Sequence, residues 1–207
     1  MQGGLRFVKR RQDWRVGRWV AKGAVSDCLG GVQVEDIAVL ATEDGSPCVR
    51  IPGHDAGPLA VSLSHSQGRG FAVVTRGAMN LGCDLEALVP RSPAFIRDYF
   101  TESERAMVMA FEGSARDEAA TLVWVAKEAA LKATRQGLPA DTRSLDVRVP
   151  DDAAVGEDRA PLTVTLFSGR PLRGWLRRLD GFAWAVLADA LAPTRILERR
   201  GTAGAAD

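Results

Sequence analysis

The chain has 207 residues, of which 46% are hydrophobic and 26% charged, and its net charge is +1. This composition is typical of one large globular domain or two small lobes, and it argues against a general nucleic-acid or membrane binder. No apolar run approaches the ~20 residues of a membrane span, and the first residues form no hydrophobic signal segment. Three cysteines without metal-binding spacing predict reduced thiols and a cytoplasmic location.

The first half of the chain predicts one helix followed by short strands. A basic amphipathic pattern over residues 8–29 indicates a helix that ends before Gly30-Gly31. Alternating apolar residues between glycine and proline breaks then indicate strands. The clearest of these segments are LAVSLSHS (59–66), GFAVVTRG (70–77) and NLGCDLEAL (80–88).

The second half predicts helices first and strands afterwards. Ser92 before Pro93 indicates one helix start, and Thr101 with Glu104 forms a capping box for the next helix. A long helix is expected around residues 115–135. Later strands are expected in SLDVRVP (144–150), LTVTLFSG (162–169) and GFAWAVLADA (181–190), and the tail 193–207 is expected to be disordered.

The four residues WVAK occur twice, at 19–22 and 124–127, and each copy is followed by a GFA segment, at 70–72 and 181–183. Two matched words in the same order at similar spacing indicate an internal duplication. The simplest architecture is then two similar α+β lobes related by a pseudo-twofold axis. A coincidence between common alanine- and valine-rich words is the alternative.

Two pairs of residues are candidates for chemistry. Asp84 and Glu86 are two apart on a predicted strand, so they share a face and repel each other unless a cation lies between them. Such oxygen ligands suit Mg²⁺ or Mn²⁺. Glu128 and Lys132 are four apart and share a helix face at the edge of an apolar stripe. A solvent-facing strand edge and an ordinary surface ion pair are the plain alternatives.

The segment SLSHS places His65 between two serines just before a predicted turn. Hydroxyl groups and an imidazole at a strand end can bind phosphate. Ser64 and His65 cannot act as a nucleophile–base pair, because neighbouring strand residues point to opposite faces. A simple capped turn is the alternative.

The order and spacing of SLSHS, GCDLE and WVAKEAALKA resemble the 4′-phosphopantetheinyl transferases of the surfactin-synthetase-activating (Sfp-like) type, over about residues 5–190. The resemblance implies an α+β pseudo-dimer of two similar α/β lobes, 1–82 and 83–192, with coenzyme A in the cleft between them. It implies Mg²⁺-dependent transfer of the phosphopantetheine arm of coenzyme A to a serine of an apo acyl or peptidyl carrier protein, with release of 3′,5′-ADP. The resemblance further implies that the protein is a cytoplasmic monomer that acts in secondary-metabolite biosynthesis.

The resemblance also implies roles for individual residues. Asp84, Glu86 and Glu128 would hold the metal, and Asp84 and Glu128 would also be catalytic, with Glu128 helping to deprotonate the serine hydroxyl. Lys132 would bind phosphate and neutralise the leaving group. The coenzyme contacts would come from a loop, a strand end and basic residues, namely Gly45, Ser46, Pro47, Cys48, Ser64, His65, Arg6, Arg10, Arg18, Lys22, Lys127 and Lys132.

Two other classes of function stay open at this point. A metal-dependent phosphohydrolase acting on a nucleotide or on coenzyme A would use the same carboxylates to activate water. It would release 3′,5′-ADP without any carrier protein. A non-catalytic coenzyme A-binding module would tolerate the loss of Glu128, yet this chain retains all three carboxylates.

Overall fold

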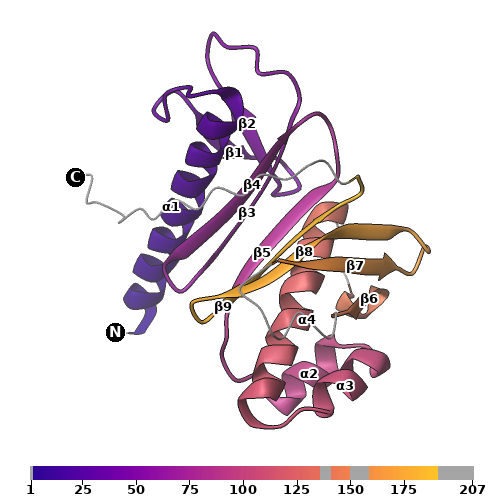
Figure 1. Ribbon diagram of the computed structural model, residues 1–207. Coiled ribbons are helices and arrows are strands. Elements are labelled where there is room, and N and C mark those ends of the chain that lie inside the picture. Colours follow the sequence, from indigo (N-terminus) through magenta and orange to yellow (C-terminus); the bar gives the residue numbers. More distant parts are fainter. Residues whose placement is uncertain (1, 136–140, 150–158, 191–207) are drawn as a thin grey trace.

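Figure 1 shows the computed structural model, which describes residues 2–135, 141–149 and 159–190, with side chains from residue 13 onward. The tail expected to be disordered, 193–207, lies outside the described residues. The N-terminal part contains one helix and two hairpins, namely α1 (Gln2–Leu29), β1 (Ala38–Ala41), β2 (Pro47–Arg50), β3 (Leu59–Ser66) and β4 (Arg69–Arg76). The remaining elements are β5 (Leu81–Ala87), α2 (Pro93–Tyr99), α3 (Glu102–Met109), α4 (Gly113–Thr134), β6 (Leu145–Arg148), β7 (Ala160–Leu166), β8 (Pro171–Leu179) and β9 (Phe182–Ala188).

The largest sheet has five antiparallel strands in the order β5-β9-β8-β7-β6. The long helix α4 crosses one face of this sheet and packs mainly against β5 and β9 (Figure 1). Its apolar stripe, which includes Val125, Ala126 and Ala129, is completely buried there. The main core of the protein therefore lies between α4 and the sheet, as the helical spacing of these residues predicts.

The β3–β4 hairpin is a layer between α1 and β5. Leu63 and His65 of β3 face α1, at 3.2 and 3.4 Å from the position that a Cβ on Gly17 would take. The serines of β3 alternate with these residues and make hydrogen bonds to β5. The two faces of the hairpin thus serve two different neighbours, which follows from the period of two along a strand.

The expected helix starts are confirmed. Ser92 accepts a hydrogen bond from the backbone N of Phe95 and is followed by proline at the first helical position. Thr101 and Glu104 form the expected capping box at the start of α3. The long helix expected around 115–135 is α4, with bounds that differ by at most two residues.

Two elements differ from the expectation. Helix α1 begins at Gln2 instead of residue 8. Strand β8 is not among the expected strands, because its sequence PLRGWLRRL is rich in arginine. Its alternation is nevertheless regular, since Leu172, Gly174 and Leu176 are buried while the intervening side chains are more exposed.

Two expectations from composition can be compared with the structure. Cys28, Cys48 and Cys83 are all free thiols, as the odd number and the spacing of the cysteines predict. Of the helices in the described ranges, none combines the length and the apolar character that crossing a membrane requires.

The repeated words lie in comparable elements but in different surroundings. Each WVAK lies on a helix, α1 or α4, and each GFA lies at the start of a strand, β4 or β9. Trp19 is 52% exposed, whereas Trp124 packs against Phe95 and Tyr99. The first helix covers a two-stranded sheet and the second a five-stranded sheet. The expected lobe boundary after residue 82 falls inside β5, which is one continuous strand.

Gly82 lies where α4 crosses β5. A Cβ at this position would lie 1.9 Å from the carbonyl oxygen of Ala129 and 2.5 Å from the backbone N of Ala133. No side chain fits at such distances from two backbone atoms, and packed interiors leave little room for adjustment. Helix and strand can therefore approach this closely only because residue 82 is glycine.

Replacing Gly82 with alanine should lower the free energy of unfolding by about 3 kcal/mol or more, because α4 must move away from β5. Gly23→Ala in α1 is the matched control, since a Cβ there meets nothing within 4 Å. Alanine at position 23 should stabilise the helix by up to about 1 kcal/mol. Urea denaturation measures both effects, and a Gly82→Ala variant as stable as the wild type would contradict the close approach.

Candidate active site

Asp84 is the central residue of the candidate site. It lies in the middle of β5 on the face toward α4 and is only 4% exposed. Its Oδ1 accepts hydrogen bonds from Ser64 Oγ and from Lys132 Nζ, each at 2.7 Å. Its Oδ2 is buried and has no hydrogen-bond partner among the described residues. The two donors fix the carboxylate in a position that leaves one oxygen available to a further ligand.

A row of serines on β3 holds this part of β5 in place. Ser62 and Ser66 accept hydrogen bonds from backbone N–H groups of β5, at 2.9 and 3.4 Å, on either side of the Ser64–Asp84 bond. His65 points to the opposite face of the strand, toward α1, and is exposed. The expected phosphate-binding pair of Ser64 and His65 therefore does not converge on one point, because the strand separates the two side chains.

Glu86 lies two residues further along β5, on the same face. Its Oε2 accepts a hydrogen bond from Arg91 Nη2 at 3.0 Å, and its Oε1 accepts one from Trp124 Nε1 at 3.2 Å. Burial and the charge of Asp84 raise the pKa of Glu86, while Arg91 opposes this shift. Both oxygens of Glu86 are thus bound by donors of the β5–α2 connection and of α4.

Glu128 contributes a third carboxylate from α4. It is half-buried, and its Oε1 is enclosed without a hydrogen-bond partner in the described part of the chain. Burial, followed by the charge of Asp84, raises the pKa of Glu128 to about 7. A carboxyl group in this state exchanges its proton near neutral pH, as a general acid or base must.

The donor chemistry of the site suits a hard cation. Asp84 and Glu128 each carry a buried carboxylate oxygen without a partner, and such oxygens are the ligands that Mg²⁺ prefers. Within the described ranges, however, no three Asp, Glu, His or Cys side chains are close enough together to hold a metal ion. Lys132 contacts Asp84 and Arg91 contacts Glu86, and the expected metal triad of Asp84, Glu86 and Glu128 stays a prediction.

The raised pKa of Glu128 should make the stability of the metal-free protein depend on pH. Its folded-state pKa of about 7 lies above the ordinary 4.5, so between these values the folded state binds the extra proton. The free energy of unfolding must then fall as the pH rises through this window. Glu128→Gln should remove this dependence and stabilise the metal-free protein at about pH 8 by roughly 1–3 kcal/mol.

Urea denaturation in the presence of a chelator, at about pH 5 and about pH 8, measures this difference. Glu35→Gln is the control, because Glu35 is an exposed carboxylate remote from α4 in the sequence. An unchanged pH dependence in Glu128→Gln would show that Glu128 ionises normally in the folded protein.

The two lysines of α4 have different roles. Burial is the largest single influence on the pKa of Lys132 and would lower it, but Asp84, Cys83 and Glu128 together outweigh burial and raise it. Lys127 is 0% exposed, and its Nζ donates to Glu104 Oε2 at 2.8 Å and to two backbone carbonyl oxygens at 2.7 and 3.0 Å. All three N–H donors of Lys127 are therefore used inside the core, and its expected contact with the coenzyme stays a prediction that this arrangement disfavours.

The expected phosphate contacts on α1 are described only in part. The guanidinium carbon of Arg18 lies 3.9 Å from the ring centroid of Trp14, and burial lowers the pKa of Arg18. Lys22 is half-buried one turn further along the helix. The side chains of Arg6 and Arg10 lie outside the described part of the structure. Since the β3–β4 hairpin lies between α1 and β5, Arg18 and Lys22 are on a helix that does not adjoin the carboxylates of β5.

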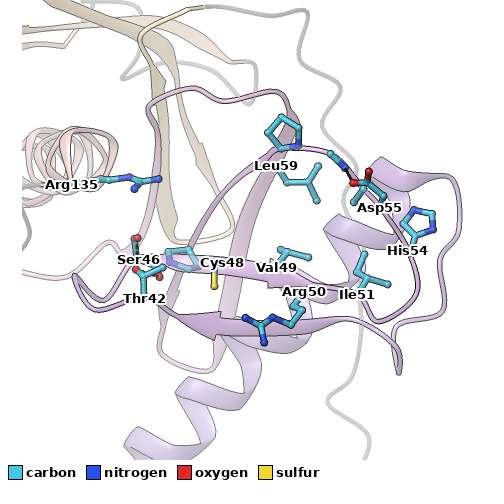
Figure 2. A pocket seen from close by; sticks show the side chains of 14 residues that line it. Thr42, Ser46, Cys48, Val49, Arg50, Ile51, His54, Asp55, Leu59 and Arg135 are labelled. Atoms are coloured by element: carbon cyan, nitrogen blue, oxygen red, sulfur yellow. Dashed lines mark hydrogen bonds between the residues drawn. The ribbon is translucent and has the colours of Figure 1, made fainter.

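The loop expected to contact the coenzyme, residues 45–48, borders a cavity of about 430 Å³ (Figure 2). Ser46, Pro47 and Cys48 line this cavity, and Gly45 forms the turn between β1 and β2 with a φ of +80°. Arg135, at the C-terminal end of α4, lines the cavity from the other half of the chain (Figure 2). The cavity therefore adjoins elements from both halves of the chain, and it carries a cation that an anionic ligand could use.

Sequence reasoning does not identify three residues of this region, namely Arg91, Trp124 and Arg135. Trp124 belongs to the repeated word WVAK and is noticeable only as part of the repeat. Arg91 and Arg135 lie in a connection and at a helix end, where no regular spacing relates them to the site. Their contacts depend on how α2 and α4 pack against the strands.

The fold and the cluster define a class of protein. It is an α+β protein in which buried carboxylates and a lysine meet between a helix and a sheet, a combination used for metal-assisted chemistry at phosphate groups. The family model of the 4′-phosphopantetheinyl transferase superfamily matches residues 80–185. The chain belongs to this superfamily, and the matched region contains Asp84, Glu86, Glu128 and Lys132.

Two solved structures similar to the chain are of the holo-(acyl-carrier-protein) synthase type. The synthase from Bacillus anthracis str. Ames, in complex with CoA (3′,5′-ADP), has 22% sequence identity and a TM-score of 0.44, and the match covers 54% of this chain and 96% of that chain. The synthase from Thermotoga maritima has 19% identity and a TM-score of 0.41, and the match covers 54% of this chain and 63% of that chain. No curated protein matches the chain. The comparisons thus establish the superfamily and do not single out its Sfp-like branch.

Proposed function

We propose that the protein is a Mg²⁺-dependent 4′-phosphopantetheinyl transferase that modifies a serine of an acyl or peptidyl carrier protein. The observation that supports this most is the contact between Lys132 and Asp84, with Glu128 beside them, inside the region of the superfamily match. This group combines a fixed carboxylate, an ammonium group and a carboxyl group that titrates near neutral pH. Metal-assisted phosphoryl transfer uses carboxylates to hold the metal, a cation to neutralise phosphate charge and a group that accepts the proton.

The metal would be held by Asp84 and Glu128, whose partnerless oxygens suit it, and the expected third ligand is Glu86. When bound, Mg²⁺ would neutralise the charge of the pyrophosphate group of coenzyme A. Lys132 lies beside Asp84 and is partly exposed, so its ammonium group can also reach a phosphate oxygen. Ser64 donates a hydrogen bond to Asp84 and would keep its carboxylate fixed when the metal and the coenzyme bind.

Glu128 would accept the proton in the transfer step. The carrier serine oxygen forms a bond to the β-phosphorus of coenzyme A, and the bond from that phosphorus to the bridging oxygen breaks. The bonding electrons leave with 3′,5′-ADP, and the serine proton passes to Glu128. The carboxylate of Glu128 has a buried oxygen without a partner among the described residues, and this oxygen would take the proton.

The Sfp-like arrangement, with two similar lobes 1–82 and 83–192 in one chain, is part of the proposal. Its support is that each WVAK helix packs against a strand whose first residues include the phenylalanine and alanine of a GFA segment. Coenzyme A would then extend from the cavity lined by Ser46 and Arg135 to the carboxylates of β5 and α4. Because one chain supplies both sides of the site, the enzyme would act as a monomer. It would be cytoplasmic, and its carrier would belong to secondary-metabolite biosynthesis.

Incubation with coenzyme A, Mg²⁺ and a panel of apo carrier proteins tests the proposal. The panel should include fatty-acid, polyketide and peptide-synthetase carriers, each with a variant whose attachment serine is alanine. We expect the intact mass of at least one carrier to increase by one phosphopantetheine arm, with equimolar 3′,5′-ADP and no change in the alanine variant. Release of 3′,5′-ADP without a carrier would instead identify a phosphohydrolase.

A further inference from the structure

Arg135 ends α4 in a backbone conformation that favours glycine. Its φ of 55° and ψ of 25° are left-handed, and its backbone N–H donates to the carbonyl oxygens of Leu131 and Lys132. Glycine is common at such helix ends, because a Cβ makes the left-handed conformation less stable. The cap needs only the backbone, so the arginine side chain introduces a strain that the helix end does not require. Strain of this kind points to a role outside the fold.

The side chain of Arg135 extends from α4 toward the cavity of about 430 Å³ (Figure 2). It is exposed, and its guanidinium makes no hydrogen bond or ion pair with another residue that the structure describes. Hydrogen bonds from Thr42 and Ser46 are the main cause that lowers the pKa of Asp44 to about 2, and the charge of Arg135 adds to them. The guanidinium is therefore free to bind an anionic ligand in the cavity.

The walls of the cavity suit both parts of a nucleotide. Arg50 and Arg135 supply positive charge, and Asp55 is the one carboxylate among the lining residues. The Oδ1 of Asp55 accepts a hydrogen bond from the backbone N of Gly57 at 3.0 Å. The charge balance thus favours an anion, and the volume lies in the range of small-ligand sites. A base can lie against the apolar part of the wall, which includes Pro47, Val49 and Leu59.

Arg135 follows Lys132 by three residues, and Lys132 contacts Asp84 at 2.7 Å. This spacing places the two cations on one side of α4, about 4.5 Å apart along the helix axis. In the proposed transferase, the diphosphate of coenzyme A lies at Lys132 and the metal. The coenzyme has one other phosphate group, on the 3′ oxygen of its ribose, and this group needs a cation of its own.

We infer that Arg135 binds the 3′-phosphate of coenzyme A and makes the enzyme select coenzyme A over dephospho-coenzyme A. The inference rests on the proposed function and adds a specificity-determining residue to it. Arginine suits this task, because its guanidinium can donate two parallel hydrogen bonds to a phosphate group. The contact with the ligand then offsets the strain of the left-handed backbone at residue 135.

Isothermal titration calorimetry of the full chain with 3′,5′-ADP and with 5′-AMP tests the inference without a carrier or a catalytic step. The two nucleotides differ only in the 3′-phosphate. The wild type should bind 3′,5′-ADP at least about tenfold more tightly, because the arginine contact is charge-assisted. Arg135→Ala should lose most of this preference and bind 5′-AMP within about threefold of the wild type. The control is Arg148→Ala, which removes a 92% exposed side chain from β6.

Arg135→Gly separates the binding role of residue 135 from its backbone. Glycine and alanine remove the same cation, but only glycine relieves the left-handed strain. The melting temperature of Arg135→Gly should therefore be about 2–4 °C above that of Arg135→Ala. Both variants should lose the preference for 3′,5′-ADP to the same extent. Equal melting temperatures would contradict the strain from which the inference starts.

Transfer assays extend the test to the reaction. With coenzyme A and dephospho-coenzyme A as alternative donors, the ratio of their kcat/KM values should fall by about tenfold or more in Arg135→Ala. An undiminished preference for 3′,5′-ADP in this variant, or an equal loss of affinity for both nucleotides, would overturn the inference while leaving the transferase proposal intact. A wild type that binds neither nucleotide and modifies no carrier would instead refute the proposed function itself.

Discussion

Replacing Asp84 with asparagine should lower the rate of carrier modification by at least about 100-fold. Loss of a residue that only supports a metal ligand can already lower activity by up to about 100-fold, and Asp84 is proposed to bind the metal directly. The substitution retains the shape of the side chain but removes the charge that faces Lys132 and the metal. Modification is measured as the initial rate of carrier mass gain at saturating coenzyme A and Mg²⁺. Asp36→Asn, a substitution of an exposed aspartate, is the control and should retain the wild-type rate.

The same variant should also be less stable than the wild type without metal, by about 1–3 kcal/mol. Spacing alone suggests the opposite, because two neighbouring carboxylates repel each other and the loss of one would relieve the repulsion. In the structure, Lys132 and Ser64 already compensate Asp84, so its replacement by a neutral amide leaves the Lys132 ammonium group without its counter-ion. Transfer at a normal rate by Asp84→Asn in excess Mg²⁺ would refute the assigned role of this carboxylate.

Lys127→Met should lower the free energy of unfolding by about 3–5 kcal/mol, the usual effect of breaking a buried ion pair. Lys127 and Glu104 are both 0% exposed, with 2.8 Å between Nζ and Oε2. Glu104 also accepts hydrogen bonds from the backbone N of Thr101 and of Val147, each at 2.8 Å. The pair therefore joins α4 to the start of α3 and to β6.

Urea denaturation of the full chain measures this loss, and Lys22→Met in the first WVAK copy is the matched control. Lys22 is half-buried, so its removal should cost much less. The paired variant Lys127→Met with Glu104→Gln should recover part of the stability, because the buried carboxylate is then neutral. A Lys127→Met variant of normal stability with weakened coenzyme binding would support the coenzyme contact that the sequence suggested.

Local patterns in the sequence determined much of the candidate site. The alternation in GCDLE places Asp84 and Glu86 on one face of β5, and the spacing of four places Glu128 and Lys132 on one face of α4. These relations follow from the periods of 2 and 3.6 residues, which hold for any strand or helix whatever its neighbours are. The helix caps at Ser92 and Thr101 were equally predictable, because capping involves residues within one turn.

The burial of the carboxylates could not be derived from these periods. An alternating strand suggests one core face and one open face, yet both faces of β5 are covered. Helix α4 lies over the face of Asp84, whereas Cys83 packs on the other face in a cluster that includes Trp184. The packing of α4 on β5 buries Asp84 and brings its charge close to Glu128, and this packing depends on contacts between segments far apart in the chain.

The repeated segment WVAK separates the properties that the sequence determines from those that depend on the tertiary structure. The identical residues determined two helices with equivalent faces, and nothing in them distinguishes Lys22 from Lys127. Their surroundings differ because the second helix is also packed against α3 and β6, which enclose Lys127 and supply its anion. Covalent spacing sets the direction of a side chain, but burial and charge pairing depend on distant segments. The sequence therefore determined which residues can meet, and the tertiary structure decided that Lys132 meets Asp84 while Lys127 is enclosed in the core.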